Sequence, residues 1–450
     1  DSKQLVKSID KELKIIYFAT TSKLDSREGV IIQAILKQYE KNSKNIKLEI
    51  IDVNKRPDLA KNYEIYEDGT VYLSYNNRNK KLSSIDFWEI TQAPDETSQG
   101  KQLFTAEKLI SSAIRYLLSA EGKKVYFILG HKEKYTNDYQ PEGYSTVSEY
   151  LGKINREVIN INLLEKGKIP EDASLIVIAA PTEDYSKEEI KLIEEYISKG
   201  GKFILITDFD VNSNIVSILL KKYDIIQQNG VLVDNINYFY GLGFFYPLLQ
   251  LSYHKITEKV QEYNKPVLIK TAAPLIINPD TPRSEDYQII SLGNTFETSW
   301  NDIAKEYDFK SEPDFDKNKE KKGVKHLGFV IESLKAKNSK GQNEPIGIIY
   351  CDSDMFTNNI LKYGYSLGNL MLFENSVNFL LDDFVLLNIP GKDLDTTKVT
   401  LSAKAHRYIS LTLFVFIEVL ALLIIFGLRF YKNYIKKFEL RKEVENEKIE

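Results

Sequence analysis

Residues 169–210 read IPEDASLIVIAAPTEDYSKEEIKLIEEYISKGGKFILITDFD and decide the fold of the central part of the chain. Two short apolar runs, at 174–179 and 202–207, flank a stretch from Lys187 to Lys199 that has the spacing of an amphipathic helix. The glycine pair 200–201 follows this stretch, as is common where a helix ends. The order predicts two parallel strands joined by a helix.

The same alternation of apolar runs and amphipathic stretches continues on both sides of this segment. It is typical of a doubly wound parallel sheet with helices on both faces. The region 236–345 interrupts the pattern and is predicted to be an insertion. Further strands are expected at 124–129, 157–161 and 346–350, and further helices near 147–151 and at 367–381.

The first hundred residues show a different order of elements. Apolar runs at 14–18 and 46–53 flank a helical pattern at 30–39, and two shorter strands at 70–75 and 81–85 follow as a hairpin. This β-α-β-β order suggests a thioredoxin-like domain. The loop after its first strand contains no cysteine, which excludes thiol redox chemistry.

The chain is therefore predicted to be an α/β protein with several parts. These are a thioredoxin-like domain at 1–105, the first part of a flavodoxin-like domain at 106–235, the insertion at 236–345, the last strand and helix of that domain at 346–400, a transmembrane anchor at 401–430 and a cytoplasmic tail at 431–450.

The C-terminal anchor is predicted from residues 408–428, YISLTLFVFIEVLALLIIFGL, which have the length that a helix needs to cross a bilayer. A buried core helix is the alternative. Positive residues are more frequent after this segment than before it, so the tail is expected in the cytoplasm and residues 1–407 outside, provided that no upstream segment reverses the bias. Glu418 lies within the segment and is expected to contact a polar group of a partner membrane helix, or else to be a tolerated, protonated carboxyl.

Composition narrows the function classes further. Lys and Arg number 60 against 64 Asp and Glu, so no strong positive field exists to attract nucleic acid. Cys351 is the only cysteine, which excludes an intramolecular disulfide and a zinc motif, and neither a metal nor another cofactor is expected. The phosphate-binding motif of ATPases does not occur, so any powered transport needs another polypeptide.

Several motifs are spread along the chain. They are IDVNKRPDLAKNYEI at 51–65, AEKLISSAIRYLL with VYFILGHKE at 106–133, the segment 169–210, YHKIT at 253–257, SW at 299–300 and IIYCDSDMFTNN at 348–359. Together these motifs resemble the gliding-motility-associated ABC transporter auxiliary proteins, the GldG-like family. The resemblance covers nearly the whole chain and implies a central domain like that of class I glutamine amidotransferases without their catalysis, an ABC permease and ATPase as partners, and a further membrane helix ahead of Asp1.

Polar residues at the predicted strand ends form the candidate ligand-binding cluster. Ligands of open α/β sheets bind beyond the carboxyl ends of the strands, where carboxylates and a histidine could hold a cation or a peptide amine. The alternative is that these residues cap helices or close turns. The candidates are His131, Glu133, Asp208, Asp210, Asp352 and Asp354.

Two further features leave their roles open. Cys351 ends a strand but lacks the glycines of a nucleophile elbow, so it is predicted to be a small buried residue. Residues 238–246, YFYGLGFFY, are either an exposed interaction surface or part of the core.

These patterns favour a non-catalytic, extracytoplasmic and membrane-anchored auxiliary subunit of an ABC transporter complex, which could form homo- or hetero-oligomers of auxiliary subunits. The alternatives are a membrane-tethered hydrolase or amidotransferase-like enzyme, and an anchored protein that binds a solute or peptide directly.

Overall fold

The computed structural model describes most of the first 382 residues and part of the C-terminal region. The chain divides into two compact units, 1–393 and 394–450. The described residues are 2–90, 102–118, 123–303, 307, 309, 311–338, 341–382, 392–393, 423, 426–432 and 435.

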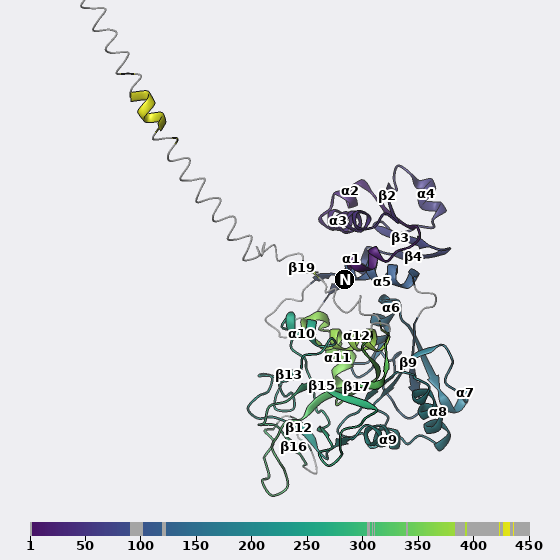
Figure 1. Cartoon of the computed structure of the whole chain (residues 1–450), viewed down its shortest axis with the longest axis vertical. Coiled ribbons are helices and arrows are strands. Elements are labelled where there is room, and N and C mark those ends of the chain that lie inside the picture. The colour runs from purple at the N-terminus through teal and green to yellow at the C-terminus, as the bar shows by residue number, and fades with distance from the viewer. Residues whose placement is uncertain are drawn as a thin grey trace, which may run out of the picture. The chain divides into compact units, whose positions relative to one another are not determined.

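The N-terminal region forms a four-stranded sheet with the strand order β2-β1-β3-β4 (Figure 1). Strands β1 and β2 are parallel and are joined through helix α3, whereas β3 and β4 form an antiparallel hairpin. Asn76 and Asn77 form the turn with φ values of 49° and 63°, as the hairpin predicts. The turn leads directly into β4, so this strand begins earlier than expected. The bounds are β1 Leu13–Ala19, α2 Thr21–Asp25, α3 Arg27–Asn42, β2 Ile46–Asp52, α4 Pro57–Asn62, β3 Thr70–Tyr75 and β4 Arg78–Leu82.

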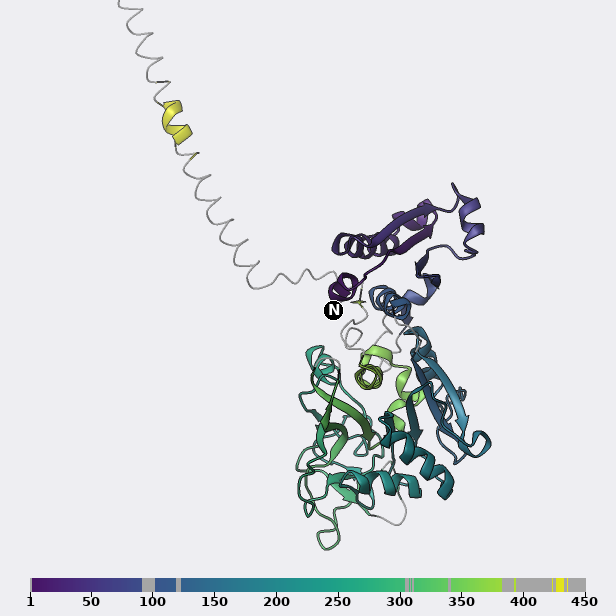
Figure 2. The ribbon, with the colours of Figure 1, turned by 45° about the vertical axis from the view of Figure 1, so that its right-hand side comes forward.

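The central sheet contains five neighbouring parallel strands in the order β8-β7-β9-β10-β18. This is the predicted mixed α/β arrangement. Figure 2 shows helix α12, in light green, near the strands of this sheet, and every residue of α12 is buried. The bounds are α5 Ala106–Leu118, β7 Lys124–Leu129, α6 Ser145–Lys153, β8 Glu157–Asn162, α7 Leu163–Lys166, β9 Ala173–Ala179, α8 Lys187–Ser198, β10 Phe203–Ile206, α9 Asn214–Lys222, β18 Asn343–Tyr350, α11 Asn358–Leu361 and α12 Asn369–Leu380.

The region predicted as an insertion contributes strands to this same sheet. Strand β17 pairs antiparallel with β18, and β14 and β15 pair antiparallel with β17. Because hydrogen bonding to β18 continues the sheet, this region shares the core of the parallel strands. Its elements are β13 Gln250–Leu251, α10 Glu258–Glu262, β14 Leu275–Ile277, β15 Tyr287–Asn294, β16 Trp300–Asp302 and β17 His326–Lys337. Two short strands just before it, β11 Ile225–Gln227 and β12 Val231–Val233, pair with β14 and β16.

The predicted membrane anchor lies mostly outside the described residues. Leu423, residues 426–432 and Ile435 are helical, whereas Glu418 is not among the residues that the structure describes. Within the described parts of the chain, no helix is both long and apolar enough to span a bilayer.

Candidate functional site: the carboxyl edge of the central sheet

The order in which the chain adds parallel strands to the central sheet reverses between β7 and β9. The chain runs from β7 outward to β8, and then returns to the other side of β7 to form β9 and β10. Ligands of open α/β sheets bind at such a switch point, beyond the carboxyl ends of the two strands. In this chain the loops after Leu129 and after Ala179 meet there.

These two loops are joined by backbone hydrogen bonds. The Lys134 amide donates to the Ala179 carbonyl at 3.0 Å, and the Thr182 and Glu183 amides donate to the His131 carbonyl at 3.0 and 3.2 Å. Lys132 and Ala180 have φ values of 60° and 50°, a backbone conformation that non-glycine residues seldom adopt. The surrounding bonds therefore hold the two loops in one defined conformation.

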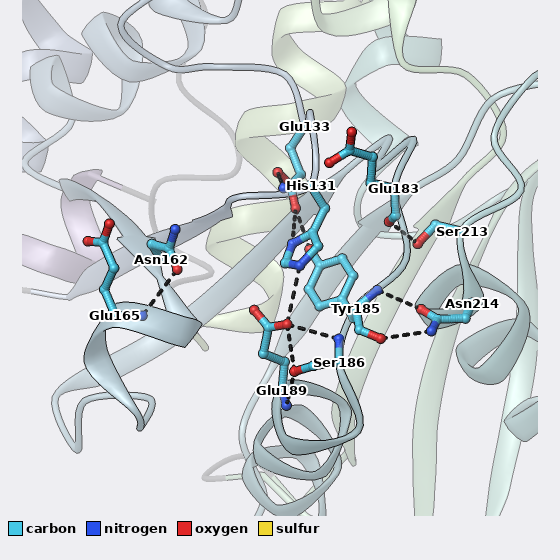
Figure 3. A network of polar contacts seen from close by, with 10 residues as sticks. All are labelled: His131, Glu133, Asn162, Glu165, Glu183, Tyr185, Ser186, Glu189, Ser213 and Asn214. Carbon is cyan, nitrogen blue, oxygen red and sulfur yellow. Dashed lines mark hydrogen bonds and ion pairs between the residues drawn. The ribbon is translucent and has the colours of Figure 1, made fainter.

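His131 lies in the switch-point crevice and stacks on Tyr185 (Figure 3). The two ring centroids are 3.8 Å apart at an interplanar angle of 18°. Glu133 binds both of these residues: its Oε1 accepts from the Tyr185 hydroxyl at 2.5 Å, and its Oε2 accepts from the His131 amide at 2.8 Å. The His131 Nδ1 atom is 3.4 Å from Glu133 Oε1.

Glu189 faces the other side of the imidazole. Its Oε2 is 3.2 Å from His131 Nε2 and also accepts from the Ser186 amide and hydroxyl, at 2.9 and 2.8 Å. Ser186 and Glu189 form a capping box, which satisfies backbone amides at the start of α8. Glu189, in the first turn of this helix, therefore also contacts the histidine.

This switch-point network is closed to solvent. The exposed fractions of Glu189, Glu133, Tyr185 and His131 are 1%, 2%, 3% and 5%. Burial and the neighbouring Glu133 carboxylate raise the pKa of Tyr185, so its hydroxyl stays a hydrogen-bond donor. The chain's own side chains occupy the crevice, where Glu133 and Glu189 accept hydrogen bonds from Tyr185, His131 and Ser186. His131 Nδ1 and Glu189 Oε1 are buried there without a hydrogen-bond partner among the residues that the structure describes.

A second group lies at the ends of β10 and β18. Asp208 Oδ2 accepts from the Ser353 hydroxyl at 2.5 Å and from its amide at 3.2 Å, and Oδ1 accepts from the Phe209 amide at 2.8 Å. Burial raises the pKa of Asp208 to about 7, and the nearby Asp354 charge adds to this effect.

Asp352 and Asp354 complete this carboxylate group. Asp352 is fully buried and accepts from the amides of Lys270 and Asp354, both at 2.7 Å. Burial and the charges of Asp208 and Asp354 raise the pKa of Asp352 well above its usual range. The Asp354 carboxylate pairs with Lys270 at 2.9 Å and with Lys134 at 3.7 Å, so Lys134 connects this group to the switch-point loops.

The predicted cluster is thus two groups rather than one. His131 and Glu133 belong to the switch-point network, and Asp208, Asp352 and Asp354 belong to the carboxylate group. Asp210 is exposed and influences Asp208 only through its charge. Among the described residues, no three His, Cys, Asp or Glu side chains are placed to hold a metal ion.

Sequence reasoning missed Tyr185, Glu189 and Lys270. The Ser186-x-x-Glu189 spacing predicts a capping box, and so the hydrogen bonds between these two residues. It does not predict that Glu189 also faces His131. Nothing in the local sequence marks Lys270, because it reaches Asp354 from the region predicted as an insertion.

Cys351 is fully buried at the end of β18, as predicted. Burial and the charges of Asp352 and Asp208 raise the pKa of its thiol, so the thiolate needed for nucleophilic attack is disfavoured.

An open pocket occurs at the opposite edge of the sheet, where the parallel strands begin. It has a volume of about 590 Å³. Its lining includes Lys123, Tyr196, Gly201, Lys202 and Glu344. Lys202 and Glu344 form an ion pair at 2.6 Å, which neutralises part of its wall.

The fold and the site define a mixed α/β protein whose switch-point crevice is filled by its own buried polar network. The model of a protein family described as an ABC-type uncharacterized transport system matches residues 122–383, more than half of the chain. The chain belongs to this family of ABC-type transport system auxiliary components. No curated protein sequence matches it.

Solved structures show weaker likenesses. The N-terminal domain of mmIFT52 is 15% identical with a TM-score of 0.39, covering 57% of this chain and 97% of that one. A ThuA-like protein from Bacteroides uniformis ATCC 8492 is 12% identical with a TM-score of 0.34, over 58% of this chain and 92% of that one. Mitochondrial thioredoxin 3 from Saccharomyces cerevisiae is 21% identical with a TM-score of 0.14, over 18% and 72%. Likenesses at these scores carry no information on function.

Proposed function

We propose that the chain is a non-catalytic, extracytoplasmic auxiliary subunit of an ABC transporter complex, anchored in the membrane by its C-terminal segment. The observation that carries the proposal is the closed switch point, in a chain of a transport-auxiliary family: His131 and Tyr185 fill the place where an α/β enzyme would bind its substrate. The buried Cys351 thiol adds to this, since an amidotransferase needs an accessible thiolate.

The finer assignment of domains belongs to the same proposal. The strand order of the N-terminal sheet suits a thioredoxin-like domain at 1–105. The order β8-β7-β9-β10-β18 suits a flavodoxin-like or amidotransferase-like domain at 106–235 and 346–400, with 236–345 inserted. The relation to gliding-motility-associated members rests on the motifs alone.

The proposed partners are an ABC permease and its ATPase. The apolar segment 408–428 would cross the membrane, with the body outside and the tail 431–450 in the cytoplasm. Glu418 would meet a polar group of a permease helix, because a carboxylate facing lipid costs at least ~2.5 kcal/mol. Several auxiliary subunits could share one complex.

Affinity purification through the C-terminal tail tests this proposal. We expect the permease and the ATPase to be recovered with the wild-type chain and their yield to fall in the Glu418→Leu variant. Recovery of neither protein would contradict the proposed function. Equal recovery with Glu418→Leu would contradict the role of Glu418 alone.

A further inference from the structure

Residues 235–253 contain no charged side chain, in a chain in which 28% of residues are charged. Their first half forms a hairpin, which we call the aromatic hairpin (residues 236–248). Its two arms are joined by a bridge between Tyr238 and Pro247 and by a hydrogen bond from the Phe239 amide to the Tyr246 carbonyl at 3.0 Å. The sequence left open whether residues 238–246 form an interaction surface or part of the core. In the structure, some aromatic residues of the hairpin lie in the core and others lie at the surface.

The root of the aromatic hairpin is held firmly. The fully buried Asp234 accepts from the amides of Ile236 and Asn237, both at 2.9 Å, and from the Thr298 hydroxyl at 2.6 Å. Phe245 packs in a small apolar cluster with Val231, Val233 and Trp300. The hairpin is therefore ordered before it meets any partner, which lowers the entropic cost of binding.

The tip of the aromatic hairpin projects apolar groups into solvent. Tyr240 is 95% exposed and Leu242 is 46% exposed. Gly241 and Gly243 have φ values of 92° and 111°, and no atom lies within 4 Å of the position that a Cβ would take. The tip is thus turned by its backbone, and the Gly243 amide donates to the Phe239 carbonyl at 3.3 Å. Tyrosine is one of the residue types that most often dominate the binding energy of protein interfaces, and Leu242 adds apolar surface two positions away from Tyr240.

Acidic side chains border the hairpin. The exposed Glu142 lies close enough to act electrostatically on Tyr246 and on Lys270. Lys270 also acts on Tyr246, but its charge is paired with Asp354 at 2.9 Å. The exposed Glu312 accepts from the Asn235 side chain at 3.1 Å, next to the start of the hairpin. An anionic lipid surface would repel these carboxylates, whereas basic side chains of a protein would attract them.

We propose that the aromatic hairpin docks into an apolar pocket, bordered by Lys or Arg side chains, on a partner protein. Tyr240 and Leu242 would fill the pocket, and Glu142 and Glu312 would pair with its basic border. The inference deepens the proposed auxiliary role, because assembly with another subunit supplies such a partner.

A photo-crosslinking residue at position 240 tests this docking. We use Tyr240→p-benzoylphenylalanine in the full chain in its native membranes, with Tyr66→p-benzoylphenylalanine as the matched control, because Tyr66 is 89% exposed in the N-terminal region. We expect a covalent protein adduct at 240 and none at 66, with the crosslinked peptide lying next to Lys or Arg residues. Combining the crosslinking residue at position 240 with Glu142→Lys and Glu312→Lys should lower the yield of the protein adduct at least about fivefold, because like charges would then face each other.

Several outcomes would overturn the proposal. These are lipid adducts only, an adduct only with a second copy of this chain, equal adducts at both positions, no adduct, or a yield that the charge reversals leave unchanged. Purification through the tail measures the proposed function separately. Recovery of permease and ATPase without a protein adduct at 240 would reject the hairpin docking and leave the auxiliary role intact.

Discussion

At the scale of single residues, the strand ends hold carboxyl groups that burial keeps from ionising easily. Asp208 and Asp352 are both nearly inaccessible, and burial is the largest cause of the rise in pKa of each. The bonds from Ser353 to Asp208 tie the ends of β10 and β18 together, and the bond from the Lys270 amide to Asp352 ties the end of β18 to the segment around Lys270. The free energy of unfolding should therefore depend on pH through these groups.

The pH dependence can be tested at Asp208. Its pKa is about 7 in the folded chain, against ~3.9 for an unfolded aspartate. The folded chain binds more protons between these values, so the free energy of unfolding falls as pH rises through this window. In Asp208→Asn we expect a smaller loss of thermal stability between pH 5 and pH 8. At pH 5 the variant should be about 1–2 kcal/mol less stable if the amide places a donor against the Phe209 N–H.

Thermal unfolding followed by tryptophan fluorescence at the two pH values measures both effects. Asp210→Asn is the matched control: its side chain is exposed and its charge is the last of the causes that raise the pKa of Asp208, so the pH dependence should change far less than in Asp208→Asn. An unaltered pH dependence in Asp208→Asn would contradict the prediction.

Cys351 provides a second residue-scale prediction. Because its thiol is fully buried and its pKa is raised, iodoacetamide should label it at least about tenfold more slowly in the folded chain than in urea. Mass spectrometry of the intact chain gives the labelled fraction with time. Rapid labelling of the folded chain would reopen the alternative of a cysteine-dependent enzyme.

At the scale of elements, helix α5 connects the N-terminal region to the central sheet. On one side the Tyr39 hydroxyl and the Ser111 hydroxyl are 2.7 Å apart, which ties α3 to α5. On the other side Lys108 forms an ion pair with Glu374 of α12, and both side chains are almost completely buried. A buried charge pair is costly to break, because the remaining charge stays desolvated.

Breaking this pair should destabilise the body strongly. We expect Lys108→Met to lower the free energy of unfolding by about 3–5 kcal/mol. The double variant Lys108→Met, Glu374→Leu should be more stable than Lys108→Met, because the Glu374 carboxylate is then no longer left unpaired inside. Urea unfolding of the two variants measures the difference.

The control for this prediction is an exposed ion pair. Arg56 and Asp58 are 2.8 Å apart but more than half exposed, so Arg56→Met should leave stability nearly unchanged. A Lys108→Met variant as stable as Arg56→Met would show that the buried pair contributes little.

At the scale of the whole molecule, the chain divides after Asp393 into a body and a C-terminal unit. The described hydrogen bonds and apolar clusters of the central sheet lie entirely within the body. The body should therefore keep its fold when the C-terminal unit is removed, whereas attachment to membranes should be lost.

A shortened chain that starts at Asp1 and ends after Asp393 tests this prediction. We expect this shorter chain in the supernatant after ultracentrifugation, with a melting temperature close to that of the full chain in detergent. The full chain should sediment with the membranes. A truncated body that still sediments with membranes would contradict anchoring by residues 408–428, and a truncated body that fails to fold would contradict the independence of the body.

Much of the local structure could be predicted from the sequence, because it depends on neighbouring residues. The stretch 169–210 predicts a strand, a helix and a strand, and the structure has β9, α8 and β10 there with bounds that differ by at most one residue. Periodicity, the Ser186 cap and the terminal glycines act within a few residues of each other, so they can be read from the chain directly.

The switch-point network could be predicted only in part. His131 and Glu133 follow a predicted strand, and parallel strands end at one edge of a sheet, which is why they were candidates. Tyr185 and Glu189 are more than fifty positions away in the sequence, and their contacts with His131 and Glu133 arise from the order in which the strands pair. The sequence also could not divide the six candidates into two groups.

The sequence by itself therefore determined the alternation of strands and helices, the lack of thiol and phosphate-binding motifs, and the apolar C-terminal segment, all of which depend on local composition. Only the tertiary structure decided that region 236–345 extends the central sheet, that the switch point is closed, and that Tyr240 is exposed while Phe245 is buried. These outcomes depend on pairing and packing between segments far apart in the chain, which local patterns do not encode.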